Sequence, residues 1–161
     1  MVSKAHFLAI TIAVFFFDRL TKLSIITNLQ LHESITIFPF FSLTRVHNYG
    51  IAWGFLQGSG IVSILVSILV ILLIVYNFQR IFEQKKQVII GISLILAGAT
   101  GNLVDRLLYG YVVDFLNFHI WPVFNIADCA LVLGTILFIL QKEQKSQRKT
   151  LQKTPSAEKQ D

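Results

Sequence analysis

The sequence contains few of the residues that cross-link or charge a soluble domain. Its 161 residues include one Cys and three Pro, and only 14% are Asp, Glu, Lys or Arg, compared with roughly 25% in soluble domains. One Cys cannot form an internal disulfide, and no cluster of Cys and His has the spacing of a zinc site. The sequence therefore excludes a secreted disulfide scaffold and a zinc domain, and it predicts no metal and no other cofactor.

The chain contains long apolar segments instead, with 54% hydrophobic residues and 14 Phe. Four segments, residues 6–27, 60–78, 88–108 and 124–140, are close to the roughly 20 residues that cross a hydrocarbon core. Within the first segment, the apolar run of residues 7–17 is followed by Asp18 and Arg19 rather than by a small-residue cleavage site, so we expect a retained anchor. The composition predicts an all-α membrane protein with four transmembrane helices in residues 1–141. We expect the basic tail, residues 142–161, to be disordered.

Lys and Arg are distributed unevenly between the two sides of these segments. Lys4, Arg80, Lys85, Lys86 and the basic tail fall on one side, whereas the connections on the other side contain only Arg45. Because cytoplasmic loops retain positive charge, both termini should lie in the cytoplasm. The net charge of +5 then reflects membrane topology, and we expect no nucleic-acid partner.

Two outer connections interrupt the helices, at residues 28–59 and 109–123. Polar and apolar residues alternate over residues 34–37 and 42–46, which predicts a small strand pair turned at residues 38–40. Residues 51–57 are apolar and aromatic, and we expect a short amphipathic helix on the membrane surface. Gly110 and Pro122 should end the third helix and return the chain to the fourth.

Charged residues inside the first segment need an explanation, because an Asp, Lys or Arg at mid-membrane costs about 2.5 to 3.5 kcal/mol. Asp18 and Lys22 are four residues apart on one helix face and could form an ion pair. Arg19 could extend its side chain to the membrane surface. For these three residues we favour a structural interpretation over a chemical one.

The second half of the chain repeats one spacing of polar residues. Asn102 and Asp105 are three apart, and Arg106 follows, so all three can share a helix face. Asn125 and Asp128 are again three apart, at the start of the fourth segment. Both groups lie near the predicted outer membrane face.

A third carboxylate, Asp114, lies just outside the third segment, and the chain then reverses over residues 115–123. Asp114 and Asp128 can therefore meet near the outer face. Two carboxylates in a partly desolvated pocket resist joint ionisation and hold one proton between them. One is then a general base and the other a general acid, which permits peptide hydrolysis without a covalent intermediate. Neutral hydrogen bonds could come from the side chains of Asn48, Asn102 and Asn125.

Other classes of protein also place carboxylates in membranes. A cation carrier or proton relay should distribute acidic residues through the membrane depth, whereas Asp114 and Asp128 gather near one face. A purely structural subunit leaves the Asn and Asp spacings unexplained. Cys129 has no partner His, so we interpret it as a packing residue rather than a nucleophile. His47 and His119 lie in outer connections, where histidines usually face water.

Four short motifs follow one another along the chain, at residues 48–53 (NYGIAW), 101–106 (GNLVDR), 112–115 (VVDF) and 124–128 (FNIAD). In order and spacing they resemble the motifs of bacterial lipoprotein signal peptidase, the signal peptidase II family of aspartic peptidases. The resemblance covers residues 7–140, and four ordered motifs make it specific. One departure is Trp53, where the family usually has Phe.

The resemblance implies an endopeptidase of the bacterial inner membrane that cuts signal peptides from prolipoproteins, N-terminal to a diacylglyceryl-modified Cys. The family fold has four transmembrane helices, a small periplasmic β-sheet and a surface helix, with the active site near the periplasmic face. Expected partners are the lipid-modified prolipoprotein and membrane phospholipids, and we expect a monomer. By matching position, Asp114 and Asp128 are the implied catalytic dyad. The implied supporting residues are Asn48, Asn102, Asp105, Arg106, Asn125, Asp18 and Lys22.

Overall fold

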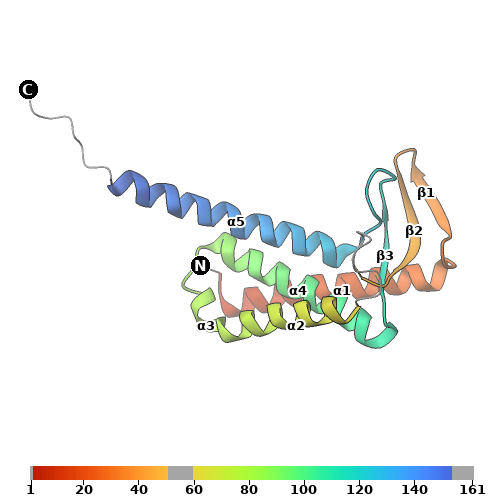
Figure 1. Cartoon of the computed structure of the whole chain (residues 1–161), viewed down its shortest axis with the longest axis horizontal. Coiled ribbons are helices and arrows are strands. Elements are labelled where there is room, and N and C mark those ends of the chain that lie inside the picture. The colour runs from red at the N-terminus through yellow and green to blue at the C-terminus, as the bar shows by residue number, and fades with distance from the viewer. Residues whose placement is uncertain (1, 51–59, 154–161) are drawn as a thin grey trace, which may run out of the picture.

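Four long helices occur where the apolar segments predict them. The structure, a computed structural model, describes residues 2–50 and 60–153, with side chains up to residue 141. The predicted surface helix at residues 51–57 lies outside the described residues. The helices extend along one common direction, with a small sheet at one end (Figure 1). Their bounds are α1 Lys4–Asn28, α2 Gly60–Tyr76, α4 Lys86–Tyr109 and α5 Ile126–Lys153, and a short α3, Phe78–Ile81, connects α2 to α4.

The helices differ in how well they satisfy the requirements of a membrane span. Within the described residues, α4 alone is both long and apolar enough to cross a membrane, while α2 and the apolar part of α5, Ile126–Gln141, are apolar but shorter. None of the residues of α2 is buried, and its exposed large side chains are apolar, which is typical of a lipid-facing helix. Four membrane crossings stay a prediction from the segment lengths.

Small residues allow α4 and α5 to pack closely. A Cβ atom added at Gly91 would lie 2.8 Å from the carbonyl oxygen of Gly134, and one added at Gly98 would overlap the carbonyl oxygen of Ala127. Membrane helices commonly use such residues to bring their backbones together. This close approach places the outer half of α4 directly beside the first turn of α5, where Asp128 lies.

The outer sheet has three antiparallel strands in the order β1-β2-β3. The predicted hairpin is confirmed as β1, Ser34–Phe38, and β2, Phe41–Asn48, while the third strand, β3, Val112–Asn117, was not predicted. In the register of β2 and β3, Val46 pairs with Asp114 and Asn48 pairs with Val112. The register therefore places Asn48 and Asp114 on the same face of the sheet.

The sheet is fixed to the end of α1. Buried Val113 and Phe115 of β3 pack against Ile25 and Leu29 at the end of that helix. Arg45 of β2 donates hydrogen bonds from Nη1 to the carbonyl oxygens of Leu29, at 2.9 Å, and of Ile26, at 3.2 Å. A cation at a helix C-terminus satisfies free carbonyls and favours the helix dipole. These contacts hold the strands across the end of the bundle.

Helix α5 continues to Lys153, so it extends into residues 142–153 of the tail that we expected to be disordered. This stretch is rich in Lys, Gln, Glu and Arg and contains no Gly or Pro. Such residues have high helix propensity, so the helix does not end where its apolar part ends.

Candidate active site

Asp128 lies in the first turn of α5, where its side chain helps to form the helix start. Asn125 precedes the helix, and its Oδ1 accepts a hydrogen bond from the backbone N–H of Asp128 at 2.9 Å. In return, Oδ2 of Asp128 accepts from the backbone N–H of Asn125 at 3.3 Å. This reciprocal pair is a capping box. The half-buried carboxylate of Asp128 is therefore held in one orientation by the helix that contains it.

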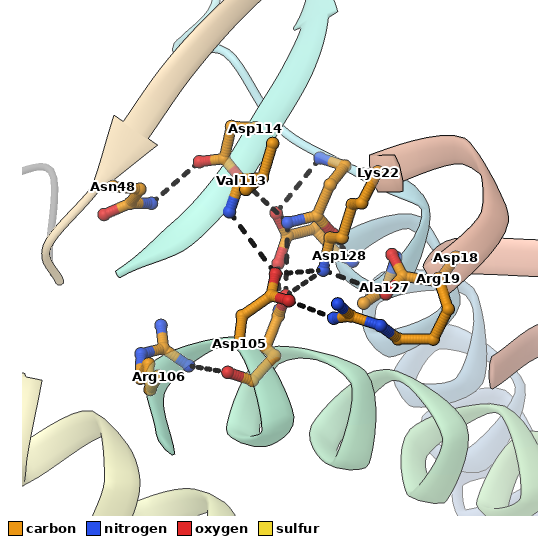
Figure 2. Close-up of polar contacts among 12 residues, drawn as sticks. Asp18, Arg19, Lys22, Asn48, Asp105, Arg106, Val113, Asp114, Ala127 and Asp128 are labelled. Carbon is orange, nitrogen blue, oxygen red and sulfur yellow. Dashed lines mark hydrogen bonds and ion pairs between the residues drawn. The ribbon is translucent and has the colours of Figure 1, made fainter. Parts of the chain in front are cut away.

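Asp114 lies in the middle of β3, and its side chain is buried. Its Oδ2 accepts from Nδ2 of Asn48 on β2 at 2.9 Å, and its Oδ1 accepts from Nδ2 of Asn125 at 2.6 Å. Figure 2 shows Asp114 between Asn48 and the start of α5. The carboxylate is thus held by two neutral amides, one from the sheet and one from the cap of α5.

The two acids are joined through a short chain of amides. Nδ2 of Asn125 donates to Asp114 and also lies 3.1 Å from Oδ1 of Asn102, whose Nδ2 donates to Oδ1 of Asp128 at 2.7 Å. The predicted convergence of Asp114 and Asp128 is therefore present in the structure. Asn48, Asn102 and Asn125, the three residues expected to supply neutral hydrogen bonds, all contact this pair, and we call these two acids and three amides the dyad site.

Burial changes the ionisation of Asp114. Its location in the sheet, away from water, raises the pKa of this carboxyl from 3.8 to about 7, and the nearby negative charge of Asp128 acts in the same direction. The hydrogen bonds from Asn48 and Asn125 oppose the rise. Near neutral pH, Asp114 is therefore available in its protonated form, which is the form that a general acid requires.

A second group of charged residues lies between α1 and α4, and we call Asp18, Arg19, Lys22 and Asp105 the ion cluster. Lys22 Nζ contacts Asp105 Oδ2 at 2.8 Å and Asp18 Oδ2 at 2.9 Å. Arg19 Nη1 contacts Asp105 Oδ1. The predicted pair of Asp18 and Lys22 is confirmed, and the prediction that Arg19 extends to the membrane surface is wrong. Asp105 is fully buried, and the guanidinium of Arg19 supplies part of its charge compensation.

The ion cluster also holds the backbone on which the two acids lie. Asp105 Oδ2 accepts from the backbone N–H of Val113 at 3.3 Å, and Asp18 Oδ1 accepts from the backbone N–H of Ala127 at 2.9 Å. Val113 directly precedes Asp114, and Ala127 directly precedes Asp128. Each buried carboxylate of the ion cluster therefore fixes the peptide group next to one acid of the dyad site (Figure 2).

Lys22 connects the ion cluster to the dyad site. Its third contact is with Oδ1 of Asn102, at 3.1 Å. An ammonium group can only donate, so this contact requires the carbonyl end of the Asn102 side chain to face Lys22. The NH2 end then faces Asp128, to which it donates at 2.7 Å. Lys22 thereby sets the orientation of an amide in the dyad site.

Arg106 and Gly101 lie beside the site. Arg106 donates from Nη1 to the backbone carbonyl of Asn102 at 3.4 Å. It therefore contacts the backbone of a helix turn that carries an amide of the dyad site. Gly101 was not among the predicted site residues, but a Cβ atom there would lie 2.8 Å from Asp18 Oδ2. Its place beside Asn102 in a motif is the signal that could have identified it.

In the part of the chain that the structure describes, neither a histidine nor a metal-binding cluster forms part of the dyad site. His47 stacks on Tyr111 with ring centroids 3.7 Å apart, and burial together with Arg45 lowers the pKa of its imidazole. The side chain of Asn48, the residue after His47 on β2, donates to Asp114. Among the described residues, no group of three or more His, Cys, Asp and Glu side chains is placed to hold a metal ion.

Comparisons with known proteins agree with this architecture. A family model described as "Signal peptidase (SPase) II" matches residues 10–142. The chain is similar to a lipoprotein signal peptidase of Moorella thermoacetica, with 43% identity over 84% of this chain and 91% of the relative. It is similar to another from Alteromonas mediterranea, with 36% identity over 90% of this chain and 84% of the relative.

Two solved structures have similar folds. One, described as a bacterial membrane enzyme solved by the in meso method at 2.3 Å resolution, has a TM-score of 0.79 and 32% identity, covering 98% of this chain and 94% of its own. A second, solved by the same method at 1.9 Å resolution, has a TM-score of 0.75 and 35% identity, covering 85% and 92%.

Proposed function

Because the chain belongs to the signal peptidase II family and is a membrane protease that removes signal peptides from prolipoproteins, we propose that Asp114 and Asp128 are its catalytic dyad. The observation that supports this role is their shared set of neutral partners. Asn125 donates to Asp114 and caps the helix turn of Asp128, and Asn102 donates to Asp128. Neutral amides orient both carboxylates and, unlike cations, do not favour the ionised form of both. One carboxylate can therefore carry a proton while the other is ionised.

In the proposed reaction, Asp128 is the base and Asp114 is the acid. The N-terminus of α5 favours a negative charge at Asp128, and the raised pKa of Asp114 favours its protonated form. Asp128 takes a proton from water, whose oxygen attacks the scissile carbonyl carbon, while Asp114 donates its proton to the carbonyl oxygen. Asp128 then gives its proton to the leaving nitrogen as the C–N bond breaks. The hydroxyl proton returns to Asp114 as the carbonyl reforms.

The location of the sheet and the distribution of positive charge support a substrate that its lipid group holds in the membrane. The sheet that contains Asp114 lies at one end of the helices (Figure 1), whereas Lys4, Arg80, Lys85 and Lys86 lie in the helix ends and connections away from the sheet. We propose that the termini are cytoplasmic and that the dyad faces the periplasmic side of the inner membrane. A diacylglyceryl-Cys held there by its acyl chains would have the preceding peptide bond at the depth of the dyad. Membrane confinement then supplies part of the positioning.

We further propose that residues 1–141 form the peptidase unit and that it acts as a monomer on its lipid-modified prolipoprotein substrate, in contact with phospholipids. Both acids, all three amides and the ion cluster come from a single chain. No second copy is needed to complete the dyad site.

The test is cleavage of a purified prolipoprotein with and without the diacylglyceryl group. Asp114→Asn and Asp128→Asn should each lower kcat by a factor of about a thousand or more, since each removes an acid–base group, while the melting temperature stays close to wild type. Glu83→Gln makes the same carboxyl-to-amide change at an exposed loop position and should leave cleavage unchanged. Retained cleavage by either Asp variant would contradict the dyad, and equal cleavage of unmodified precursor would contradict the lipid-held substrate.

A further inference from the structure

One end of the outer sheet consists of large apolar side chains that have no cover in the described structure. They lie at the end of β1, in the turn after it and in the loop after β3, and their exposed fractions reach 93% for Ile120 and 66% for Trp121. We call these five residues the apolar tip: Phe38, Phe40, Phe118, Ile120 and Trp121.

The two loops of the apolar tip lie at the same end of the sheet. Ser42 pairs with Asn117 in the register of β2 and β3, and the rings of Phe41 and Phe118 have centroids 4.8 Å apart. Both loops extend beyond the outline of the helix bundle on the side where α5 lies (Figure 1). The tip is therefore a single projecting surface beside the bundle, at the level where the helices end.

The sequence around the apolar tip has no Asp, Glu, Lys or Arg, although each of its two loops contains a proline, Pro39 and Pro122. The uncharged stretches are residues 34–44 and 115–127. Exposed edges of soluble sheets usually also have charged residues that prevent association. An uncharged apolar surface that includes a Trp fits a membrane interface, where Trp side chains are enriched.

The apolar tip continues the apolar surface of the helices. The Phe118 ring stacks on Phe124, with centroids 5.9 Å apart, and Phe124 comes just before α5. Along α5 the exposed side chains include Val132 and Leu133, which face lipid in a membrane enzyme. The apolar surface therefore extends from the lipid-facing side of α5 through Phe124 and Phe118 to the tip.

We propose that the apolar tip inserts into the lipid interface beside α5 and anchors the sheet to the membrane surface. Phe118, Ile120 and Trp121 of the tip follow directly after β3, the strand that contains Asp114, so the depth of the tip determines the depth of Asp114. The proposal depends on the membrane location of the chain and not on the assignment of the dyad. Its test therefore does not use cleavage.

The experiment measures the depth of Trp121 by fluorescence quenching. The chain has two Trp, so Trp53→Phe leaves Trp121 as the only one. In vesicles of phosphatidylethanolamine and phosphatidylglycerol with brominated acyl chains, Trp121 should lose most of its emission, while aqueous iodide should have little effect. The positive control is Tyr76→Trp with both native Trp residues replaced by Phe, because Tyr76 is exposed on α2. Free N-acetyltryptophanamide gives the response of a Trp in water.

Three outcomes decide the proposal. Quenching by brominated lipid, reduced in a Phe40→Ser/Ile120→Ser variant that keeps its melting temperature, supports insertion of the tip as a unit. Quenching by iodide and not by bromine would show that the tip lies in water and would overturn it. Protection from iodide that disappears when the protein is diluted into more lipid would show that a second copy covers the tip, which would also overturn it.

Discussion

The ion cluster and the dyad site are built from the same types of residue but differ in charge balance. In the ion cluster, two carboxylates face one ammonium and one guanidinium, and the contacts close on one another. In the dyad site, the contacts of the two carboxylates with described residues are with amides, and none is with a Lys or Arg side chain. The paired charges of the ion cluster suit a structural role. Two neighbouring carboxylates without a directly bound cation resist joint ionisation, which is the property that acid–base chemistry needs.

The geometry of the dyad site also depends on the ion cluster. The ion cluster holds the peptide groups of Val113 and Ala127, next to the two acids, and Lys22 orients Asn102. Buried charge is expensive in a membrane protein unless it is paired. Here the ion pairs of the ion cluster form a rigid support for the two acids of the dyad site.

The largest effect should follow from giving the dyad site a cation. In Asn48→Lys, the new ammonium would replace an amide that donates to Asp114 at 2.9 Å and would favour the ionised form of that acid. We expect kcat to fall by a factor of about a hundred or more, because the general acid is lost. Cleavage measured from pH 5 to pH 8 tests this, with Asn48→Gln as the neutral control. Cleavage by the Lys variant at the wild-type rate would show that activity does not depend on the difference in charge balance between the dyad site and the ion cluster.

The next effect should follow from removing one of the two cations of the ion cluster, the ammonium of Lys22. Lys22→Met leaves Asp18 without its ion-pair partner and leaves Asp105 with Arg19 alone. Breaking a buried pair in this way should lower the free energy of unfolding by about 3–5 kcal/mol, seen in thermal or denaturant unfolding in detergent. Lys86→Met, at an exposed position, is the matched control. The double change Lys22→Met/Asp18→Asn should recover part of the loss, and failure to do so would contradict the role of Lys22 as a counter-ion.

A third prediction concerns pH, and it distinguishes the dyad site from the ion cluster. Because the pKa of Asp114 is about 7, cleavage should fall as pH rises above 7, by about tenfold per pH unit once the acid is ionised. The folded chain keeps this proton up to about pH 7, whereas the unfolded chain loses it near pH 4. The contribution of Asp114 to stability is therefore lost as pH rises through that window.

The matching control for the pH prediction is Asp114→Asn. This variant should lose the decline of stability between pH 4 and pH 7, because it has no proton to release there. Equal slopes in the variant and the wild type would assign the pH dependence to another group.

Local patterns predicted the parts of the molecule that depend on neighbours in the sequence. Hydropathy located the helices, alternation located the β1–β2 hairpin, and the four-residue spacing of Asp18 and Lys22 predicted their pair. The contact between Arg19 and Asp105 joins residues 86 apart in the chain, and such contacts depend on packing that spacing does not encode. β3 was missed because the run after Gly110 is short, and its pairing with β2 required the sheet itself.

The smallest effect should come from a change that touches the ion cluster only through sterics. In Gly101→Ala, the new Cβ would lie 2.8 Å from Asp18 Oδ2, so the carboxylate must move away from the N–H of Ala127 that it holds. We expect a loss of about 1–3 kcal/mol in unfolding free energy and a reduction of kcat by a few fold. Gly60→Ala is the control, since its Cβ would meet Tyr49 at an ordinary 3.6 Å. If Gly101→Ala lowers stability with no effect on kcat, the contact of Asp18 with Ala127 supports the fold without positioning Asp128, and the dependence between the two groups would be limited to the contacts of Asp105 with Val113 and of Lys22 with Asn102.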